Sequence, residues 1–217
     1  MANITGTASD TGGAGLSSIN ITVYNQTGGK YWNGSDWGSS DLVWLETNGT
    51  TSWYNDSAVP TWTNASTYYV NATATDAAGN VGGKTWNSFF FDDNGLWSEA
   101  TDISPYWNTD GTQSVTFTAG DPGSGLVNVS LYYRYSATND TGWSSWTVWN
   151  HASNPDTTPW DPTAWSFNFP SGAGHYEFRT VATDNASNTE TVSGSDTSCG
   201  YDDTNPFVNI TLSLIHI

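Results

Sequence analysis

The sequence predicts an all-β protein made of two tandem β-sandwiches, because of its length, its composition and an internal repeat. Its 217 residues suffice for two domains of about 100 residues, each able to bury one core. Gly, Asn, Ser, Thr and Asp are abundant, and the 13 Trp and 11 Tyr suit pleated, half-buried surfaces. Asp76 of "ATDAAGN" returns 184 − 76 = 108 residues later as Asp184 of "ATDNASN". "FDDN" at 91–94 returns as "YDDT" at 201–204, an offset of 110, and such near-constant offsets indicate tandem duplication.

Within each copy, apolar and polar residues alternate with the period of two that is typical of half-buried strands. In "LVNVSLYYRY", residues 126–135, Val129, Leu131 and Tyr133 share one face, which we predict to be buried. Val70 and Phe178 lie on the inward rows of later strands and are also predicted to be buried. Short strands separated by Gly, Asp and Asn turns favour a sandwich over parallel βαβ units.

The offsets divide the chain into five stretches. These are repeat 1 (1–91), a linker (92–101), repeat 2 (102–201), a linker with the first strand of a truncated third repeat (202–211), and a tail (212–217). "FVNIT" at 207–211 matches "MANIT" at 1–5, so a third copy is expected to begin where the second ends. The tail "LSLIHI" resembles the translation of a transposon end sequence used in preparing sequencing libraries. We therefore expect a non-native tail on a fragment of a larger protein.

Several motifs resemble the immunoglobulin-like or fibronectin III-like repeats of bacterial and archaeal surface and secreted proteins. "YWNGSDW" and "YYVNATATDAAGN" carry the resemblance in the first copy, and "LYYRYSATNDTGWSSWTVW" and "YEFRTVATDNASN" resemble a sister subtype. The resemblance extends nearly to Thr211 and implies immunoglobulin-like sandwiches in an extracellular or cell-surface protein. It leaves the role open, since such repeats serve as stalks, spacers, adhesin units and accessory modules. Ser187 stands where the pattern usually has Gly.

Charge and cysteine content narrow the expected partners. Lys and Arg number 4 against 21 Asp and Glu, and the net charge of −17 excludes nucleic acid and anionic membrane surfaces. The sequence lacks an apolar run of about 18 residues, so we expect no membrane insertion. Neighbouring repeats of the same polypeptide are the expected partners, with surface glycans or proteins as further candidates. Cys199 is the single cysteine and cannot form an intrachain disulfide.

We do not expect an enzyme. The sequence has no G-x-S-x-G, H-E-x-x-H, phosphate-binding glycine loop or C-x-x-C. His151, His175 and His216 are isolated in the sequence, so neither a catalytic serine with its base nor a zinc site is expected.

Acidic residues in turns predict a candidate calcium site. In an immunoglobulin-like sandwich the B–C and F–G loops lie at the end where strand A enters. Asp92 and Asp93 of the linker should therefore approach Asp121, Asp184 and Asn188, whose oxygens suit the about 6–8 ligands of calcium. The equivalent half-site of the first copy comprises Asp10, Asp76 and Asn80. Each Asp also fits plain turn chemistry, because Asp bonds its own backbone.

Aromatic residues leave two classes of function open. "WSSWTVW" is predicted to put Trp143 and Trp149 on one strand face and Trp146 on the other, either for packing or for stacking on sugars. N-x-S/T sequons at Asn20 and Asn71 fall on predicted outward faces, which suits a glycosylated surface protein. We expect a structural or adhesive extracellular repeat that spaces or presents other domains, with calcium as its candidate stiffener. The alternative is a carbohydrate-binding accessory module of a secreted hydrolase.

Overall fold

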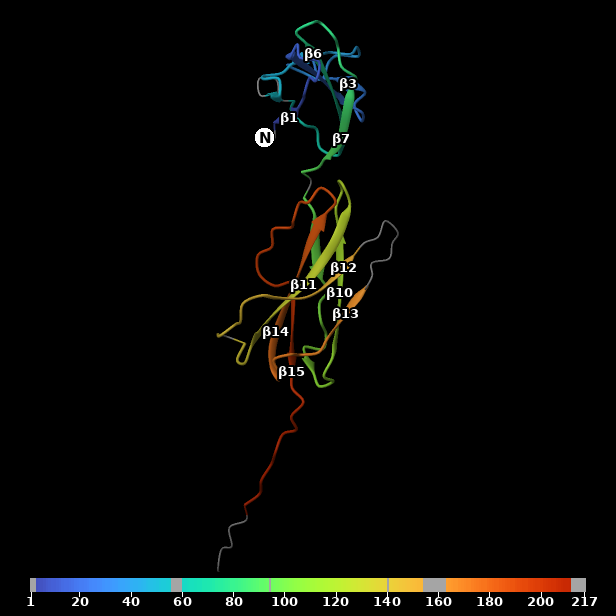
Figure 1. The fold of residues 1–217 in the computed structure, drawn as a ribbon. Helices are drawn as coiled ribbons and strands as arrows, with labels where there is room; N and C mark the ends of the chain where they lie inside the picture. Colours follow the sequence, from blue (N-terminus) through green and yellow to red (C-terminus); the bar gives the residue numbers. More distant parts are fainter. Residues whose placement is uncertain (1–2, 56–59, 94, 140, 154–162, 212–217) are drawn as a thin grey trace, which may run out of the picture. The chain divides into compact units, whose positions relative to one another are not determined.

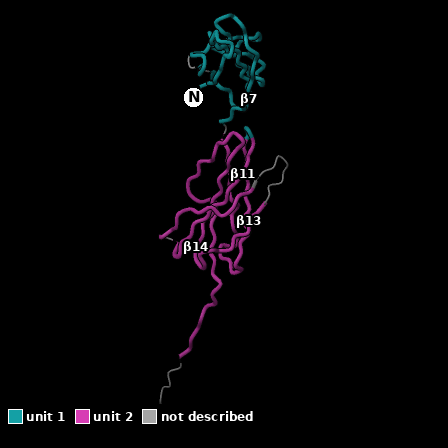
Figure 2. The backbone as a smooth tube through the Cα atoms, viewed as in Figure 1, with its two compact units in different colours: residues 1–94, 122–124 teal, residues 95–121, 125–217 magenta. Residues whose placement is uncertain are grey.

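The structure, a computed structural model, describes residues 3–55, 60–93, 95–139, 141–153 and 163–211. These residues form strands and turns without a helix, which confirms the all-β prediction (Figure 1). Within this part of the chain there is accordingly no helix long and apolar enough to cross a membrane. The chain divides into two compact units (Figure 2). Unit 1 comprises residues 1–94 and 122–124, and unit 2 comprises residues 95–121 and 125–217.

Unit 1 contains seven strands among its described residues. They are β1 (Ile4–Thr7), β2 (Leu16–Asn25), β3 (Lys30–Tyr31), β4 (Leu45–Glu46), β5 (Ser52–Asn55), β6 (Ser66–Asp76) and β7 (Thr85–Phe91). One sheet pairs β1 with β5, and the other has the order β3-β2-β6-β7 with β4 also on β2. The period-two row Ile19, Ile21 and Val23 of β2 packs with Trp32 and with Trp53 of β5, so the core lies between the two sheets.

Unit 2 contains eight strands in its described part. They are β8 (Trp97–Ala100), β9 (Trp107–Asn108), β10 (Gln113–Gly120), β11 (Leu126–Ser136), β12 (Thr147–Ser153), β13 (Ala164–Phe167), β14 (Gly174–Asp184) and β15 (Thr197–Tyr201). The sheets have the orders β13-β10-β8 and β12-β11-β14-β15-β9. Val115 and Trp165 of the first sheet pack against Leu131 and Phe178 of the second. Two sandwiches are therefore present, as predicted.

Five residues were predicted to be buried, and three of them are. Val129, Leu131 and Phe178 are fully buried. The prediction was wrong for Tyr133 and Val70, which are half-buried. Tyr133 packs against the margin of the unit 2 core, whereas Val70 lines an open hollow in unit 1.

The ends of the copies differ in detail from the expected boundaries. β8 lies inside the stretch 92–101 expected to be a linker, so ordered structure in unit 2 begins earlier. Residues 202–211 form no strand, and Phe207 is 91% exposed. The offset of 110 between "FDD" and "YDD" places Phe207–Ile210 on β8, whereas residues 4–7 form β1, a strand of different pairing. By this offset, residues 207–210 correspond to β8 and not to the residues 1–5 with which the motif "NIT" aligns them. Residues 212–217 lie outside the described residues.

Candidate calcium site

The Asp-x-Ala-Gly/Ser-Asn turn has the same geometry in both units. Asp184 Oδ1 accepts a hydrogen bond from Asn188 N at 2.7 Å, and its Oδ2 accepts one from Asn188 Nδ2 at 2.8 Å. Asp76 accepts the same two bonds from Asn80, each at 2.8 Å. The bond from the Asn80 side chain, followed by that from its backbone, lowers the pKa of the Asp76 carboxyl. In each turn the asparagine therefore orients a carboxylate by donating to it.

A second acidic loop lies beside the Asp184 turn in unit 2. Asp121 follows β10, and its Oδ2 accepts a hydrogen bond from Gly125 N at 2.7 Å. Asn185 N donates to Gly125 O at 2.9 Å, which ties this loop to the turn. Carboxylate oxygens of Asp121 and Asp184 lie within 4.8 Å of each other, and Asp184 is only 1% exposed. The structure thus brings together two of the carboxylates that the sequence singled out.

Unit 1 repeats this loop pair with Asp10. Asp10 accepts hydrogen bonds from Gly12 N and Gly15 N, both at 2.8 Å. Ala77 N donates to Gly15 O at 2.8 Å and joins the Asp10 loop to the Asp76 turn. The predicted half-site therefore has the backbone scaffold of the Asp121 and Asp184 pair.

Asp92 and Asp93 follow β7 and have different surroundings. Asp92 is buried, and its carboxylate accepts a hydrogen bond from Ser124 N, at the loop tip 122–124. A Cβ at Gly123 would collide with this carboxylate, so a larger residue there would have to displace the Asp92 side chain. Asp93 is exposed, and its backbone N donates to Asn64 Oδ1 at 2.6 Å. Asp92 is thus bonded to the segment 122–124, which lies between Asp121 and Gly125 in the sequence.

The chemistry of the pair selects a class of cation. Asp121 and Asp184 offer carboxylate oxygens, which are hard ligands that calcium and magnesium prefer and that suit zinc or copper less well. Gly125 N donates to Asp121 and Asn188 N donates to Asp184, so N–H groups of their own loops orient both carboxylates. Asn188 acts as a donor to Asp184 and therefore as a positioning residue.

The tryptophans of "WSSWTVW" are arranged differently from the prediction. Trp143 and Trp146 share a side, because the Arg134 guanidinium lies 5.0 Å from one ring and 4.9 Å from the other. Arg179 lies 4.3 Å from Trp146. Trp149 packs instead against the core and donates from Nε1 to Ser166 O at 3.2 Å. The predicted alternation was wrong because β12 begins only at Thr147.

Two histidines have partners that are distant in sequence. Ser130 and His151 are cross-strand neighbours on β11 and β12, with Oγ and Nδ1 2.6 Å apart. His175 Nδ1 lies 2.7 Å from the Tyr106 hydroxyl. Sequence spacing alone could not show these pairs, because the register of the sheet creates them. Ser130 is only 7% exposed, and its bond to His151 joins the two strands. His216 lies outside the described residues.

Comparison with known proteins gives the following matches. A family model described as a bacterial Ig-like domain matches residues 2–93 and 100–198. No curated protein matches the chain. A solved structure of fibronectin(III)-like modules of Clostridium thermocellum CbhA is similar at 13% sequence identity, covering 92% of this chain and 84% of that chain with a TM-score of 0.45.

Proposed function

This chain belongs to the family of bacterial Ig-like domains and is a structural repeat module, and we propose that it works outside the cell as a spacer that presents other domains. Modules of this family are generally non-catalytic and commonly extracellular. The fold by itself does not select one role among stalk, adhesin and accessory module. Support for the spacer therefore has to come from the path of the chain and from its side chains.

The observation that carries the proposal is the position of the two connections of unit 2. The incoming chain starts β8 at Trp97, which pairs with Gly120 next to Asp121. The outgoing chain leaves β15 at Tyr201, which pairs with Gly174. Gly174 and Asp184 are the two ends of β14, an eleven-residue strand. The chain therefore enters and leaves at opposite ends of the unit, as a linear array of repeats requires.

We assign calcium a stiffening role at the entry end. Asp121 and Asp184 would supply ligands from two neighbouring loops at this end of unit 2. Asp92 precedes Trp97 by five residues, and its carboxylate accepts a hydrogen bond from Ser124 N. A divalent cation would replace the repulsion between these carboxylates with attraction. Asp10 and Asp76 would form the equivalent half-site.

The tryptophans of "WSSWTVW" favour a spacer over a sugar-binding module that would use this segment. Sugar stacking needs ring faces open to solvent, whereas Trp143, Trp146 and Trp149 are each half-buried. Arginines lie over two of these rings, and the third packs on core aromatics. Glycan-array binding that is lost on Trp146→Ala with the fold retained would contradict this choice.

Calcium titration of the full chain tests the stiffening role. We expect isothermal titration calorimetry to show calcium binding, and small-angle scattering to show a narrower range of particle dimensions with calcium than with a chelator. Asp121→Asn should abolish both effects. Asp110→Asn, an exposed acid of unit 2 away from these loops, is the matched control and should leave both intact. Unchanged scattering on addition of calcium to the unaltered chain would refute the stiffening role.

A further inference from the structure

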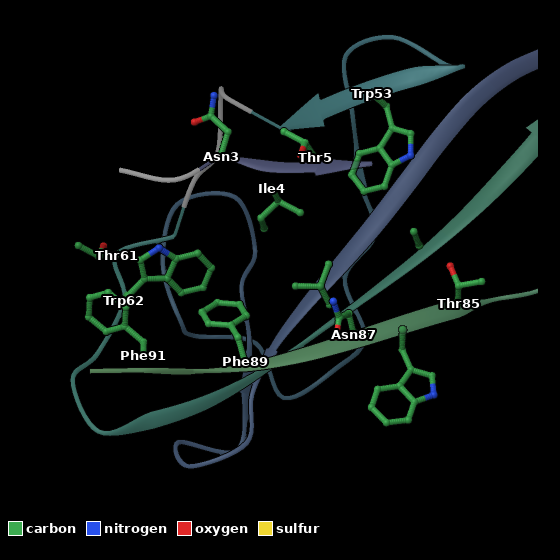
Figure 3. Close-up of a pocket in the computed structure, with 13 residues that line it drawn as sticks. Asn3, Ile4, Thr5, Trp53, Thr61, Trp62, Thr85, Asn87, Phe89 and Phe91 are labelled. Atoms are coloured by element: carbon green, nitrogen blue, oxygen red, sulfur yellow. The ribbon is translucent and has the colours of Figure 1, made fainter. Parts of the chain in front are cut away.

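Unit 1 has an open apolar hollow of about 780 Å³ (Figure 3). Figure 3 shows Ile4 and Trp53 of one sheet, Phe89 of the other, and Trp62 of the segment before β6 around this space. Phe89, which lines this hollow, is 38% exposed. An open apolar space of this size between the sheets of a sandwich indicates a place that another segment normally covers.

The equivalent positions in unit 2 are covered. Val70, Ala72, Asn87 and Phe89 of the hollow correspond, by the offsets of 108 and 110, to four buried residues. These are Phe178, Thr180, Thr197 and Cys199. The covering segment starts with β8 and continues to Ile103, which packs on the core. Ala100 N donates to Asp196 Oδ2 at 2.9 Å and Ile103 N donates to Thr197 Oγ1 at 3.1 Å.

Unit 1 has no counterpart of this covering segment among its described residues. β10 pairs with β13 on one side and with β8 on the other, whereas β1 pairs with β5 alone among the strands of the described part of unit 1. Thr7 and Ala8 correspond to Thr118 and Ala119, since 118 − 7 = 119 − 8 = 111, and the latter two pair with β8. One edge of the β1 segment is therefore left for a further strand, beside the hollow.

We propose that Phe207–Ile210 of a second copy of this chain seats in the hollow of unit 1 as its first strand. These residues occupy the β8 position of the repeat and have no strand partner in the described structure. Val208 and Ile210 are 82% and 79% exposed. They correspond to the buried Ser98 and Ala100 of β8, while Asn209 corresponds to the exposed Glu99. Both inward positions of the segment are thus apolar.

We call the site that receives this strand in each unit its seat. The chemistry of each seat matches the inward side chains of its strand. In unit 2, Glu190 accepts hydrogen bonds from Ser98 N at 3.0 Å and from its hydroxyl at 2.5 Å, and Asp196 accepts one from Ala100. The hydrogen bonds of Glu190 N to Ala182 O and of Gly82 N to Ala74 O identify Gly82 as the counterpart of Glu190. Trp86 precedes Asn87, which pairs with Val70, and Asp196 precedes Thr197, which pairs with Phe178. Trp86 is therefore the counterpart of Asp196. The seat in unit 1 therefore has no acids at these two positions and suits an apolar strand.

This seating joins copies head to tail. The donor segment of one copy binds the acceptor hollow of the next, so the interface is heterologous and leaves each dimer with one free donor and one free hollow unless a ring closes. Strand addition supplies backbone hydrogen bonds, and Val208 and Ile210 supply apolar contact. In the register of β8 on β10, Ile210 lies opposite Gly6 and Asn209 lies opposite Thr7.

Sedimentation of the full chain tests the proposal. We expect dimers and longer species to grow as protein concentration rises over about two orders of magnitude. Val208→Asp with Ile210→Asp should weaken association by at least about tenfold, because two charges would enter an apolar hollow. Asn209→Asp adds charge on the outward side and should leave association unchanged. A chain that stays monomeric throughout, or an equal effect of Asn209→Asp, would overturn the proposal.

Disulfide trapping tests the register and separates a second copy from the chain's own tail. Thr7→Cys and Asn209→Cys are placed on separate chains, which are mixed and oxidised. We expect a linked heterodimer, and we expect Thr5→Cys, two residues out of register, to link far more slowly. Cys199 is buried and does not compete. Equal rates for both positions would overturn the proposal. So would intrachain linkage alone when both cysteines are placed on one chain.

Discussion

Asp121→Asn separates a calcium site from plain turn chemistry, because the two interpretations predict opposite effects on stability. The asparagine keeps an oxygen that accepts the hydrogen bond from Gly125 N. It removes one of two negative charges whose oxygens lie within 4.8 Å of each other. If the loop needs only that hydrogen bond, the substitution is nearly neutral with or without calcium.

The magnitudes follow from this distance. Two unit charges 4.8 Å apart repel by about 1 kcal/mol in water and by about 3.5 kcal/mol at an effective dielectric constant of about 20. Asp184 is buried and Asp121 is half-buried, so we expect Asp121→Asn to stabilise the calcium-free protein by about 1–3 kcal/mol. With a Kd on the order of 10⁻⁴ M, about 10 mM calcium stabilises the unaltered chain by about 2.7 kcal/mol. A tenfold weaker site in the variant would gain only about 1.4 kcal/mol.

Urea unfolding of both chains, in chelator and in calcium, measures these differences. In chelator the variant should be the more stable, and calcium should stabilise the unaltered chain by more than it stabilises the variant. Asp110→Asn should track the unaltered chain in both buffers. Equal stabilisation of all three chains by calcium, or a variant that is less stable in chelator, would refute the argument from paired carboxylates.

Three further predictions concern unit 2. Tyr176→Phe should lower the free energy of unfolding by about 1–2 kcal/mol, because the buried Tyr176 hydroxyl donates to Gly172 O at 2.7 Å and accepts from Ser171 N at 3.1 Å. If urea titrations show a smaller loss of unfolding free energy for Tyr176→Phe than for Tyr135→Phe, the prediction is contradicted. Ser187 has φ of 71°, so Ser187→Gly should raise the melting temperature and stabilise by about 0.5–1 kcal/mol, and a lower melting temperature would count against this. Burial raises the pKa of the Cys199 thiol to about 12 from an ordinary value near 9.0, so its stabilising effect is complete below pH 9 and is lost as pH rises toward 12. Native protein at neutral pH should therefore resist thiol reagents, and labelling as fast as in urea would disprove the burial.

The fold could be predicted because its signals are local and periodic. The row through Val129 and Leu131 predicted a buried strand face, and period two by itself fixes which side chains share a face. The Asp184 turn was predictable because aspartate, asparagine and a positive φ belong to one short motif. Val70 lies on a row of the same kind and is nevertheless half-buried, since its burial depends on a segment that crosses from another edge. A strand pattern does not specify what covers it.

The candidate site was only partly predictable. Topology correctly placed the Asp121 loop beside the Asp184 turn, because hairpins at one end of a sandwich must meet there. The roles within the site depend on side-chain geometry that spacing does not show. Asn188 donates to Asp184, and Asp93 points to solvent while Asp92 is buried. The arginines over Trp146 were likewise out of reach, since they come from β11 and β14.

The difference between the two seats implies that each repeat selects its own first strand. A strand with valine and isoleucine at its inward positions would leave Glu190 in unit 2 without the Ser98 hydroxyl that now donates to it. A half-buried carboxylate that loses such a donor is penalised by desolvation, whereas a serine against the apolar hollow of unit 1 would leave a buried hydroxyl without a partner. Each mismatch is therefore unfavourable on the polar side, in addition to the apolar contact that it forgoes. Specificity between neighbouring repeats can thus reside in two inward positions of a four-residue strand, although the remaining strands share one backbone plan.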